Sequence, residues 1–288
     1  MPAVVALETA VVTHGLPRPM NLEIAYELPR LVEDAEAIPA TIGVIEGEIV
    51  VGLSPDEIER LANDDDAGKL SARDLAWANA TRASGGLTVA GVLAVCRLVG
   101  IRVFATGGIG GVHRGWTERP DVSADLAALG RTPTCVVSAG AKSILDIPAT
   151  LEALDSLGVP VIGWGVDHFP QFHSRGSDAA RVSMRADDLG VVARMLRAQW
   201  FGLESAAGAL LANPISDEHA MPHEEIEAGI AAALERAERE GVTGAALTPF
   251  LLDALAEMTG GRSIDANLAL LRSNARLAGE LAAACAGR

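Results

Sequence analysis

A lysine joins an apolar, strand-like run to a helix-like run in CVVSAGAKSILDIPATLEAL, residues 135–154. The neighbours of Lys142 are small, which leaves its side chain accessible to a ligand. A neutral lysine amine can attack carbon, and burial, a following helix start or a second cation nearby each lower a lysine pKa and so favour that form. The stretch suggests an imine-forming nucleophile; a lysine that reaches out to solvent is the alternative.

A carboxyl group ends the first strand-like run, AVVALE, residues 3–8. At the end of a strand, Glu8 could act as a general acid or base. It could equally cap a helix or form a salt bridge. His14, a few residues on, is either a turn residue or a ligand contact.

A glycine-rich segment, FATGGIGGVHRG, occupies residues 104–115. Its glycines let the backbone pass close to a ligand, and successive N–H groups could face an anion. It has neither the Gly-Lys-Ser/Thr of a P-loop nor the third glycine of GxGxxG. A tight turn is the alternative, but His113 and Arg114 can donate to phosphate and so favour anion binding. Thr106 is a further candidate contact for phosphate or substrate.

Two aspartates, Asp121 and Asp125, bracket Ser123 in the segment DVSADL. They could be ordinary helix caps. They could also bind a ligand, one carboxylate holding a hard divalent cation with waters while the others hold hydroxyl groups. No HExxH or cysteine cluster supports a zinc site, and no GxSxG supports a hydrolase triad.

Strand-like and helix-like runs alternate along the chain. Mostly continuous apolar strands indicate strands covered on both faces, so the alternation predicts an α/β fold, a three-layer α/β/α sandwich with a largely parallel central sheet. From about Leu247 the pattern is helical, and residues 1–288 are expected to form a single domain. The expected strands are 3–8, 40–52, 101–108, 134–140, 159–165 and 208–214, and the expected helices are 54–63, 87–100, 123–130, 187–203 and 223–241.

Two of the expected helices carry further information. Ser54 and Glu57 predict a capping box at the start of helix 54–63. The helix at 87–100 is apolar nearly all round, so it is expected to be central or to pack against another subunit.

Composition limits the class of protein. The 288 residues carry a formal charge of −15, which argues against nucleic acid as a partner because phosphate contacts need clustered Lys and Arg. No apolar run reaches the ~20 residues of a membrane span, and the N-terminus does not have the pattern of a signal peptide. Three scattered cysteines suggest reduced thiols. We therefore expect a soluble cytoplasmic protein.

Eight segments, in order and nearly from end to end, together resemble the pseudouridine-5'-phosphate glycosidase (indigoidine synthase A-like) family. They are ALETAVVTHGLPRPMN, PATIGVIEGEIVVGLS, KLSARDLA, FATGGIGGVHRG, DVSADL, SAGAKSILDIPATLEALDSLGVPVIG, ANPI and TPFLL.

The resemblance implies a lyase of an α/β/α fold that assembles as a trimer. It reversibly cleaves the C–C glycosidic bond of pseudouridine 5'-phosphate to uracil and ribose 5-phosphate through a lysine imine. It implies Lys142 as nucleophile, Glu8 as proton donor, and Asp121 as the ligand of one divalent ion per subunit, typically Mn²⁺. The substrate contacts it implies are Lys69, Val89, Ser123, Ala124 and Asp125.

Two positions depart from the family pattern. Leu87 stands where a threonine is expected, and Ser273 where the first residue of an Asn-Asn pair is expected. Both could alter the polarity of the pocket. The alternatives left open are an imine-forming lyase or aldolase on another sugar phosphate and a non-catalytic sugar-phosphate binding protein.

Overall fold

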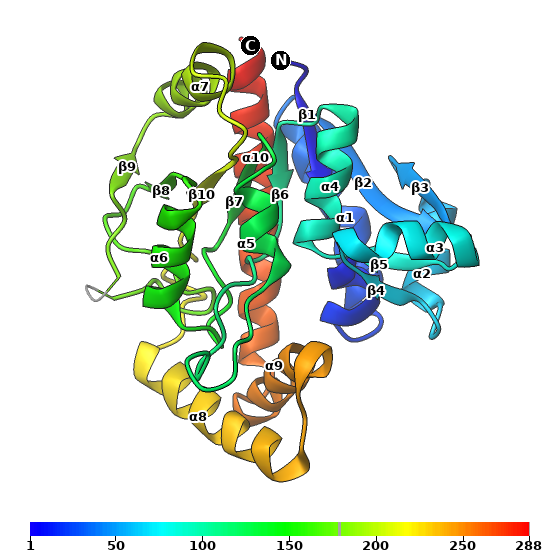
Figure 1. Ribbon diagram of the computed structural model, residues 1–288, viewed down its shortest axis with the longest axis vertical. Helices are drawn as coiled ribbons and strands as arrows, with labels where there is room; N and C mark the ends of the chain where they lie inside the picture. Colours follow the sequence, from blue (N-terminus) through cyan, green and yellow to red (C-terminus); the bar gives the residue numbers. More distant parts are fainter. Residues whose placement is uncertain (178–179, 288) are drawn as a thin grey trace.

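A ten-stranded sheet runs through the part of the chain that the computed structural model describes, residues 1–177 and 180–287 (Figure 1). Its strands are β1 (Val4–Leu7), β2 (Ile38–Ile45), β3 (Glu48–Val51), β4 (Gly68–Leu70), β5 (Gly85–Leu87), β6 (Val103–Ala105), β7 (Cys135–Ser138), β8 (Val161–Trp164), β9 (Met184–Ala186) and β10 (Ala209–Ala212). They lie in the order β4-β5-β2-β1-β6-β7-β10-β8-β9, with β3 also paired to β2. From β2 across to β9 all neighbours are parallel, which confirms the predicted sheet.

Helices connect these strands and follow the last of them. They are α1 (Met20–Asp34), α2 (Pro55–Asn63), α3 (Leu75–Thr81), α4 (Val89–Val99), α5 (Ala124–Leu129), α6 (Ile147–Ser156), α7 (Leu189–Arg197), α8 (His223–Glu240), α9 (Leu247–Met258) and α10 (Arg262–Ala286), with short turns η1 (Val11–Gly15), η2 (Ala72–Asp74), η3 (Ala198–Gly202) and η4 (Gly244–Ala246). The capping box of α2 is confirmed. Ser54 Oγ accepts from the Glu57 N–H, and the Glu57 carboxylate accepts from the Ser54 N–H at 2.8 Å.

The sheet separates two apolar cores, because successive side chains of a strand point to opposite faces. On β1, Val5 and Leu7 belong to one core and Ala6 to the other. The first core is covered by α1, α2, α7 and α10, and the second by α4, α5, α6, α8 and α9. This arrangement confirms the predicted three-layer sandwich.

The predicted strand at 40–52 is wrong in one respect, because it is a hairpin rather than one strand. β2 and β3 pair antiparallel on either side of Glu46 and Gly47, whose φ angles are both positive, at 49° and 85°. Two positive φ values in succession make the tight turn that joins hairpin strands. β4, β5 and β9 were not predicted, because three residues are too few for a hydrophobic period to show.

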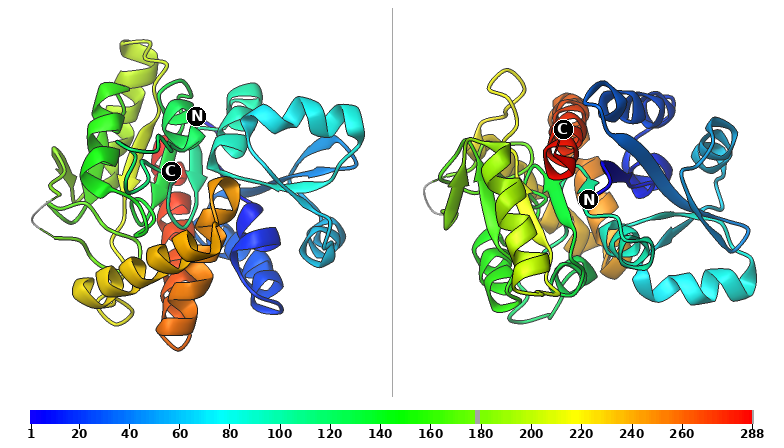
Figure 2. Two further views of the ribbon diagram at one scale, coloured as in Figure 1. Left: turned by 60° about the horizontal axis from the view of Figure 1, so that its bottom comes forward. Right: turned by 90° about the horizontal axis from the view of Figure 1, so that it is seen from above.

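The long helix α10 holds the centre of the molecule together. It packs along β1, β6 and β7 and contacts α1 and α7; in both views of Figure 2 it lies against the central strands. Asn274 on this helix is fully buried, and its Nδ2 donates to the carbonyl of Thr106 at 2.8 Å, just past β6. Its Oδ1 accepts from Asn213, which follows β10, at 2.9 Å.

The two departures from the family pattern lie behind the walls of the cavity described below. Ser273 Oγ accepts from Asn213 Nδ2 at 2.9 Å, and Leu87 is fully buried in β5. Neither side chain lines the cavity, so the expectation that they change its polarity is wrong.

The apolar helix at 87–100 is central rather than external. Val92 and Leu93 are completely buried within this chain, while Leu98, near the end of α4, is 71% exposed. No helix among the described residues is long and apolar enough to cross a membrane.

Two loops approach each other closely at Gly140, and substitution of this glycine tests the fold. Gly140 has φ = +74°, and a Cβ there would lie 1.9 Å from the Pro170 carbonyl oxygen. Gly140→Ala should lower the free energy of unfolding by about 3 kcal/mol or more, since backbone strain and overlap add. Gly158→Ala is the matched control, because φ is +67° and nothing lies within 4 Å; its cost should be about 1 kcal/mol. Equal costs in urea unfolding would contradict the overlap.

Candidate active site

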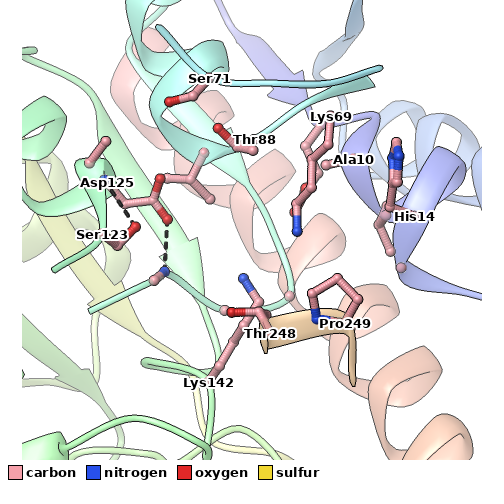
Figure 3. A pocket seen from close by; sticks show the side chains of 18 of the residues that line it. Ala10, His14, Lys69, Ser71, Thr88, Ser123, Asp125, Lys142, Thr248 and Pro249 are labelled. Atoms are coloured by element: carbon pink, nitrogen blue, oxygen red, sulfur yellow. Dashed lines mark hydrogen bonds between the residues drawn. The ribbon is translucent and has the colours of Figure 1, made fainter. Parts of the chain in front are cut away.

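A cavity of about 490 Å³ opens at the edge of the sheet where the parallel strands end (Figure 3). Its walls come from the residues after β1, from β4, from the loops after β6 and β7, and from α9 and α10. Figure 1 shows α8 and α9 together at this end of the molecule. Of the residues predicted for the site, those that line the cavity are Glu8, Lys69, Val89, His113, Asp121, Ser123, Ala124, Asp125 and Lys142.

Two loops that follow neighbouring strands remain paired beyond the sheet. The glycine-rich loop after β6 and the Lys142 loop after β7 meet at bridges between Ile109 and Ala141 and between His113 and Leu145. The Lys142 N–H donates to the Ile109 carbonyl at 3.1 Å. The main chain on either side of Lys142 is therefore fixed by hydrogen bonds to its neighbour.

Lys142 reaches the cavity from a loop that is longer than expected. β7 ends at Ser138, and α6 begins only at Ile147, with Asp146 as its N-cap. The expected helix start directly after Lys142 is therefore wrong, and the dipole of α6 is not the feature that acts on its amine. The side chain is half-buried and points into the cavity.

Glu8 lies directly after β1 and lines the same cavity. Burial raises the pKa of its carboxyl, while the positive charge of Lys142 and a hydrogen bond from the Thr106 hydroxyl oppose that rise. Thr106 itself does not line the cavity and contacts Glu8 from behind. A carboxyl whose pKa is raised keeps its proton to higher pH and so suits a proton donor.

Lys69 lies on β4 and lines the cavity together with Lys142 (Figure 3). Burial lowers the pKa of Lys69, and the positive charge of Lys142 lowers it further. The like-charge repulsion expected from this pair is thus present. Two adjacent ammonium groups repel, so the pair is more stable when one of them is neutral.

Asp125 is part of the cavity wall and holds two pieces of backbone together. Its Oδ1 accepts from the Ala90 N–H in the first turn of α4 at 2.9 Å, and its Oδ2 accepts from the Gly110 N–H at 2.8 Å. Ser123 caps α5 by accepting from the Asp125 N–H. The capping interpretation of DVSADL is thus confirmed for Ser123, and ligand binding by this segment stays a prediction, with its residues lining the cavity.

Asp121 also lines the cavity, and the structure records no hydrogen bond to its carboxylate from the described residues. Burial lowers the pKa of the neighbouring His113 imidazole; the charge of Asp121 opposes that change, and the charge of Lys142 adds to it. The described residues contain no group of three or more His, Cys, Asp or Glu that could hold a metal ion. An ion at Asp121 would therefore have fewer than three such side-chain ligands among the described residues, and water could fill the remaining positions.

The comparisons with known proteins now decide the family. The model of the family described as indigoidine synthase A like protein matches residues 1–284. The chain belongs to this family. A relative from Chloroflexus aurantiacus named pseudouridine-5'-phosphate glycosidase is 52% identical over 283 residues, 97% of this chain and 92% of the relative. One of the same name from Myxococcus xanthus is 50% identical over 98% of this chain and 93% of its own length.

Two solved structures share the fold of this family member. The prealnumycin C-glycosynthase in complex with ribulose 5-phosphate superposes with a TM-score of 0.91 at 41% identity, covering 99% of this chain and 92% of its own. An indigoidine synthase A-like protein from Thermotoga maritima gives 0.90 at 38% identity, covering 97% and 92%. These matches confirm the family and the fold that the motifs predicted.

Part of the cavity wall was not predicted. Thr248 and Pro249 in the first turn of α9, and Asn267 and Leu271 on α10, line it from segments far away in the sequence. The motif TPFLL contains Thr248 and Pro249, but no motif marked Asn267 or Leu271, because a helical period shows which face is apolar and not what that face covers. His14, left open as a ligand contact, also lines the cavity.

The structure corrects the prediction for Arg114, which the sequence suggested as a contact for an anionic ligand. It does not line the cavity. Its guanidinium instead forms an ion pair with Glu227 on α8, with Nη1 to Oε2 at 2.7 Å.

A buried histidine behind the Lys142 loop generates a pH test. Burial lowers the pKa of His173 from 6.5 to about 4, and its Nδ1 lies 2.9 Å from Ser143 Oγ. Between these pKa values the unfolded chain binds a proton that the folded chain does not. The free energy of unfolding should therefore be highest above pH 6.5. Protonation of His173 should lower it by about 3 kcal/mol towards pH 4.

Urea unfolding at a series of pH values measures the effect. His173→Gln should flatten this part of the profile, whereas His219→Gln should leave it unchanged because His219 is exposed. An unchanged slope in His173→Gln would mean that other groups cause the loss.

Proposed function

We propose that this chain reversibly cleaves the C–C glycosidic bond of pseudouridine 5'-phosphate, giving uracil and ribose 5-phosphate. The observation that carries the proposal is that Lys142, Lys69 and Glu8, whose carboxyl has a raised pKa, meet in one cavity. The names of the relatives at 52% and 50% identity support the choice of substrate.

The residue types suit a bond that has no heteroatom to receive its electrons. In the proposed reaction the Lys142 amine forms a bond to C1', the bond from C1' to the ring oxygen breaks, and that oxygen receives a proton from Glu8. The nitrogen then loses a proton to the Glu8 carboxylate, and its lone pair forms the imine as the bond from C1' to uracil C5 breaks and C5 takes a proton from Glu8. Water hydrolyses the imine, which frees ribose 5-phosphate and the lysine, and supplies the two protons overall.

The remaining side chains bind and orient the substrate in this proposal. Lys69 and His113 offer donors to the phosphate, which anchors the sugar so that binding energy remote from C1' orients the reacting bond. Val89, Ser123 and Ala124 complete the wall of the cavity.

A second candidate is synthesis of a C-glycoside on another acceptor. It is favoured by the fold shared with a C-glycosynthase that is bound to ribulose 5-phosphate. The identity of 41% to that protein, against 52% to a glycosidase, supports the first candidate. Release of uracil from pseudouridine 5'-phosphate separates the two. It also separates both from an aldolase on another sugar phosphate and from a non-catalytic binding protein.

The catalytic test centres on Lys142. The wild type should release uracil, and borohydride with ribose 5-phosphate should leave a stable adduct on the peptide that contains Lys142. Lys142→Ala should lower uracil release by roughly four orders of magnitude or more. Lys142→Arg should be equally inactive because a guanidinium stays protonated. An adduct on another lysine, or turnover by the alanine variant, would exclude this role.

We further propose that Asp121 holds one divalent ion, Mn²⁺. Asp121 lines the cavity, and no described residue donates a hydrogen bond to its carboxylate, which fits a hard ion completed by water. When bound, such an ion supplies positive charge that polarises an oxygen of the substrate.

The metal proposal has its own test. A chelator should lower uracil release roughly 100-fold, and Mn²⁺ should restore it. Asp121→Asn should match the chelated wild type and should not bind Mn²⁺ in a titration followed by electron paramagnetic resonance. Full activity in chelator would remove the ion from the proposal.

A homotrimer in the cytoplasm completes the proposed function. The family resemblance suggests the trimer, and exposed apolar side chains such as Leu98 and Trp77 support an association. Cys96, Cys135 and Cys285 are buried free thiols, as is usual in a reducing compartment. Sedimentation at micromolar concentration should show a species of three 29.8 kDa chains. A single 29.8 kDa species would contradict the trimer.

A further inference from the structure

Arg114 donates hydrogen bonds to the main chain of the Lys142 loop from outside the cavity. Its Nη2 donates to the Ser143 carbonyl at 3.0 Å, and its Nε donates to the Leu145 carbonyl at 3.3 Å. These two carbonyls belong to the first and third residues after Lys142. One planar guanidinium therefore fixes the loop at two points.

Glu227 on α8 holds that guanidinium in place. Nη1 and Nη2 of Arg114 donate to its two carboxylate oxygens at 2.7 and 2.8 Å. The hydrogen bonds from Arg114 lower the pKa of the Glu227 carboxyl, so the pair is ionised at neutral pH. Both side chains are largely covered, with 28% and 37% of their surfaces exposed.

The remaining contacts of the loop hold other atoms than the Ser143 carbonyl. The Lys142 carbonyl itself accepts from the Leu145 N–H at 3.1 Å. The pairing with the glycine-rich loop fixes Ala141 and the Lys142 N–H, and also reaches Leu145. Ser143 lies between those points; its side chain contacts His173, and its carbonyl is held by Arg114. Without the guanidinium, that carbonyl would lose its charged donor and the peptide between Ser143 and Ile144 could turn.

We propose that Arg114, held by Glu227, is a positioning residue that sets the direction of the Lys142 amine for attack on C1' of the substrate. The inference rests on the proposed function of Lys142. It assigns to Arg114 the role of fixing the Lys142 loop, in place of the anion contact that the sequence suggested. Because the guanidinium lies outside the cavity, its loss should affect the reaction rather than the binding of substrate.

Arg114→Lys is the informative variant. It keeps a cation for Glu227, but a single ammonium lacks the fork that reaches two carbonyls as well. We expect kcat for uracil release and the rate of borohydride trapping at Lys142 to fall at least tenfold, with KM changed by less than about twofold. Glu227→Gln should give a smaller loss of the same kind.

Arg262→Lys is the matched control. Arg262 also forms a forked ion pair with α8, through Glu225, but it does not touch the Lys142 loop. Its kcat, KM and trapping rate should equal those of the wild type. All assays run well below the unfolding temperature of each variant, so that a loss of stability alone does not lower the rates.

The outcomes separate this inference from the proposed function. If the wild type neither releases uracil nor forms an adduct at Lys142, the proposed function fails. If it does both and Arg114→Lys retains the wild-type kcat and trapping rate, the positioning role is wrong. A rise in KM with unchanged kcat in Arg114→Lys would also overturn it, because that result indicates a role in binding.

Discussion

The continued pairing of two loops past the end of the sheet is the constraint on which the cavity depends. Parallel strands normally separate where their hydrogen bonds stop, yet the chains after β6 and β7 stay joined through Ile109 with Ala141 and His113 with Leu145. This pairing brings the lysine loop against the glycine-rich loop. Asp125 then ties the glycine-rich loop to the first turn of α4, so three segments share one rigid rim.

The rim brings opposite charges together in a partly buried space. Two lysines enter it from β4 and from the loop after β7, while carboxyl groups enter from the end of β1 and from the DVSADL segment. The same burial raises the pKa of Glu8 and lowers that of Lys69, which moves both groups towards their neutral forms. Proton transfer to a substrate requires an acid that keeps its proton to higher pH. Attack on carbon requires an amine that is neutral.

Sequence patterns predicted the parts of the fold that local chemistry determines. Apolar runs identified β1, β6 and β7, and because parallel strands end at one edge, Glu8, Asp121 and Lys142 could be expected to meet there. The length of the loop between Lys142 and α6 was missed, although the sequence marks the helix start: Asp146 is its N-cap, and Pro148 stands in the first turn. The family resemblance suggested roles for these residues, and those roles remain predictions.

Contacts between distant segments were beyond the reach of sequence patterns. Arg114 looked like an anion contact because its neighbours are glycines, but Glu227, which neutralises it, lies on α8. The wall formed by α9 and α10 was missed for the same reason. An apolar helix face indicates that this face is buried, but not which segment or cavity it packs against. Only the tertiary structure shows that Asn267 and Leu271 line a cavity.

The long helix α10 is synthesised after the other segments that line the cavity. During synthesis the strands and both paired loops leave the ribosome before residues 262–286 do. Until then the Thr106 carbonyl has no Asn274 partner, and one side of the cavity is open. Lys142 is thus made before the complete wall around it, which forms when α10 packs against β6 and β7. The enclosure around Lys142 therefore depends on a segment more than 100 residues further along the chain.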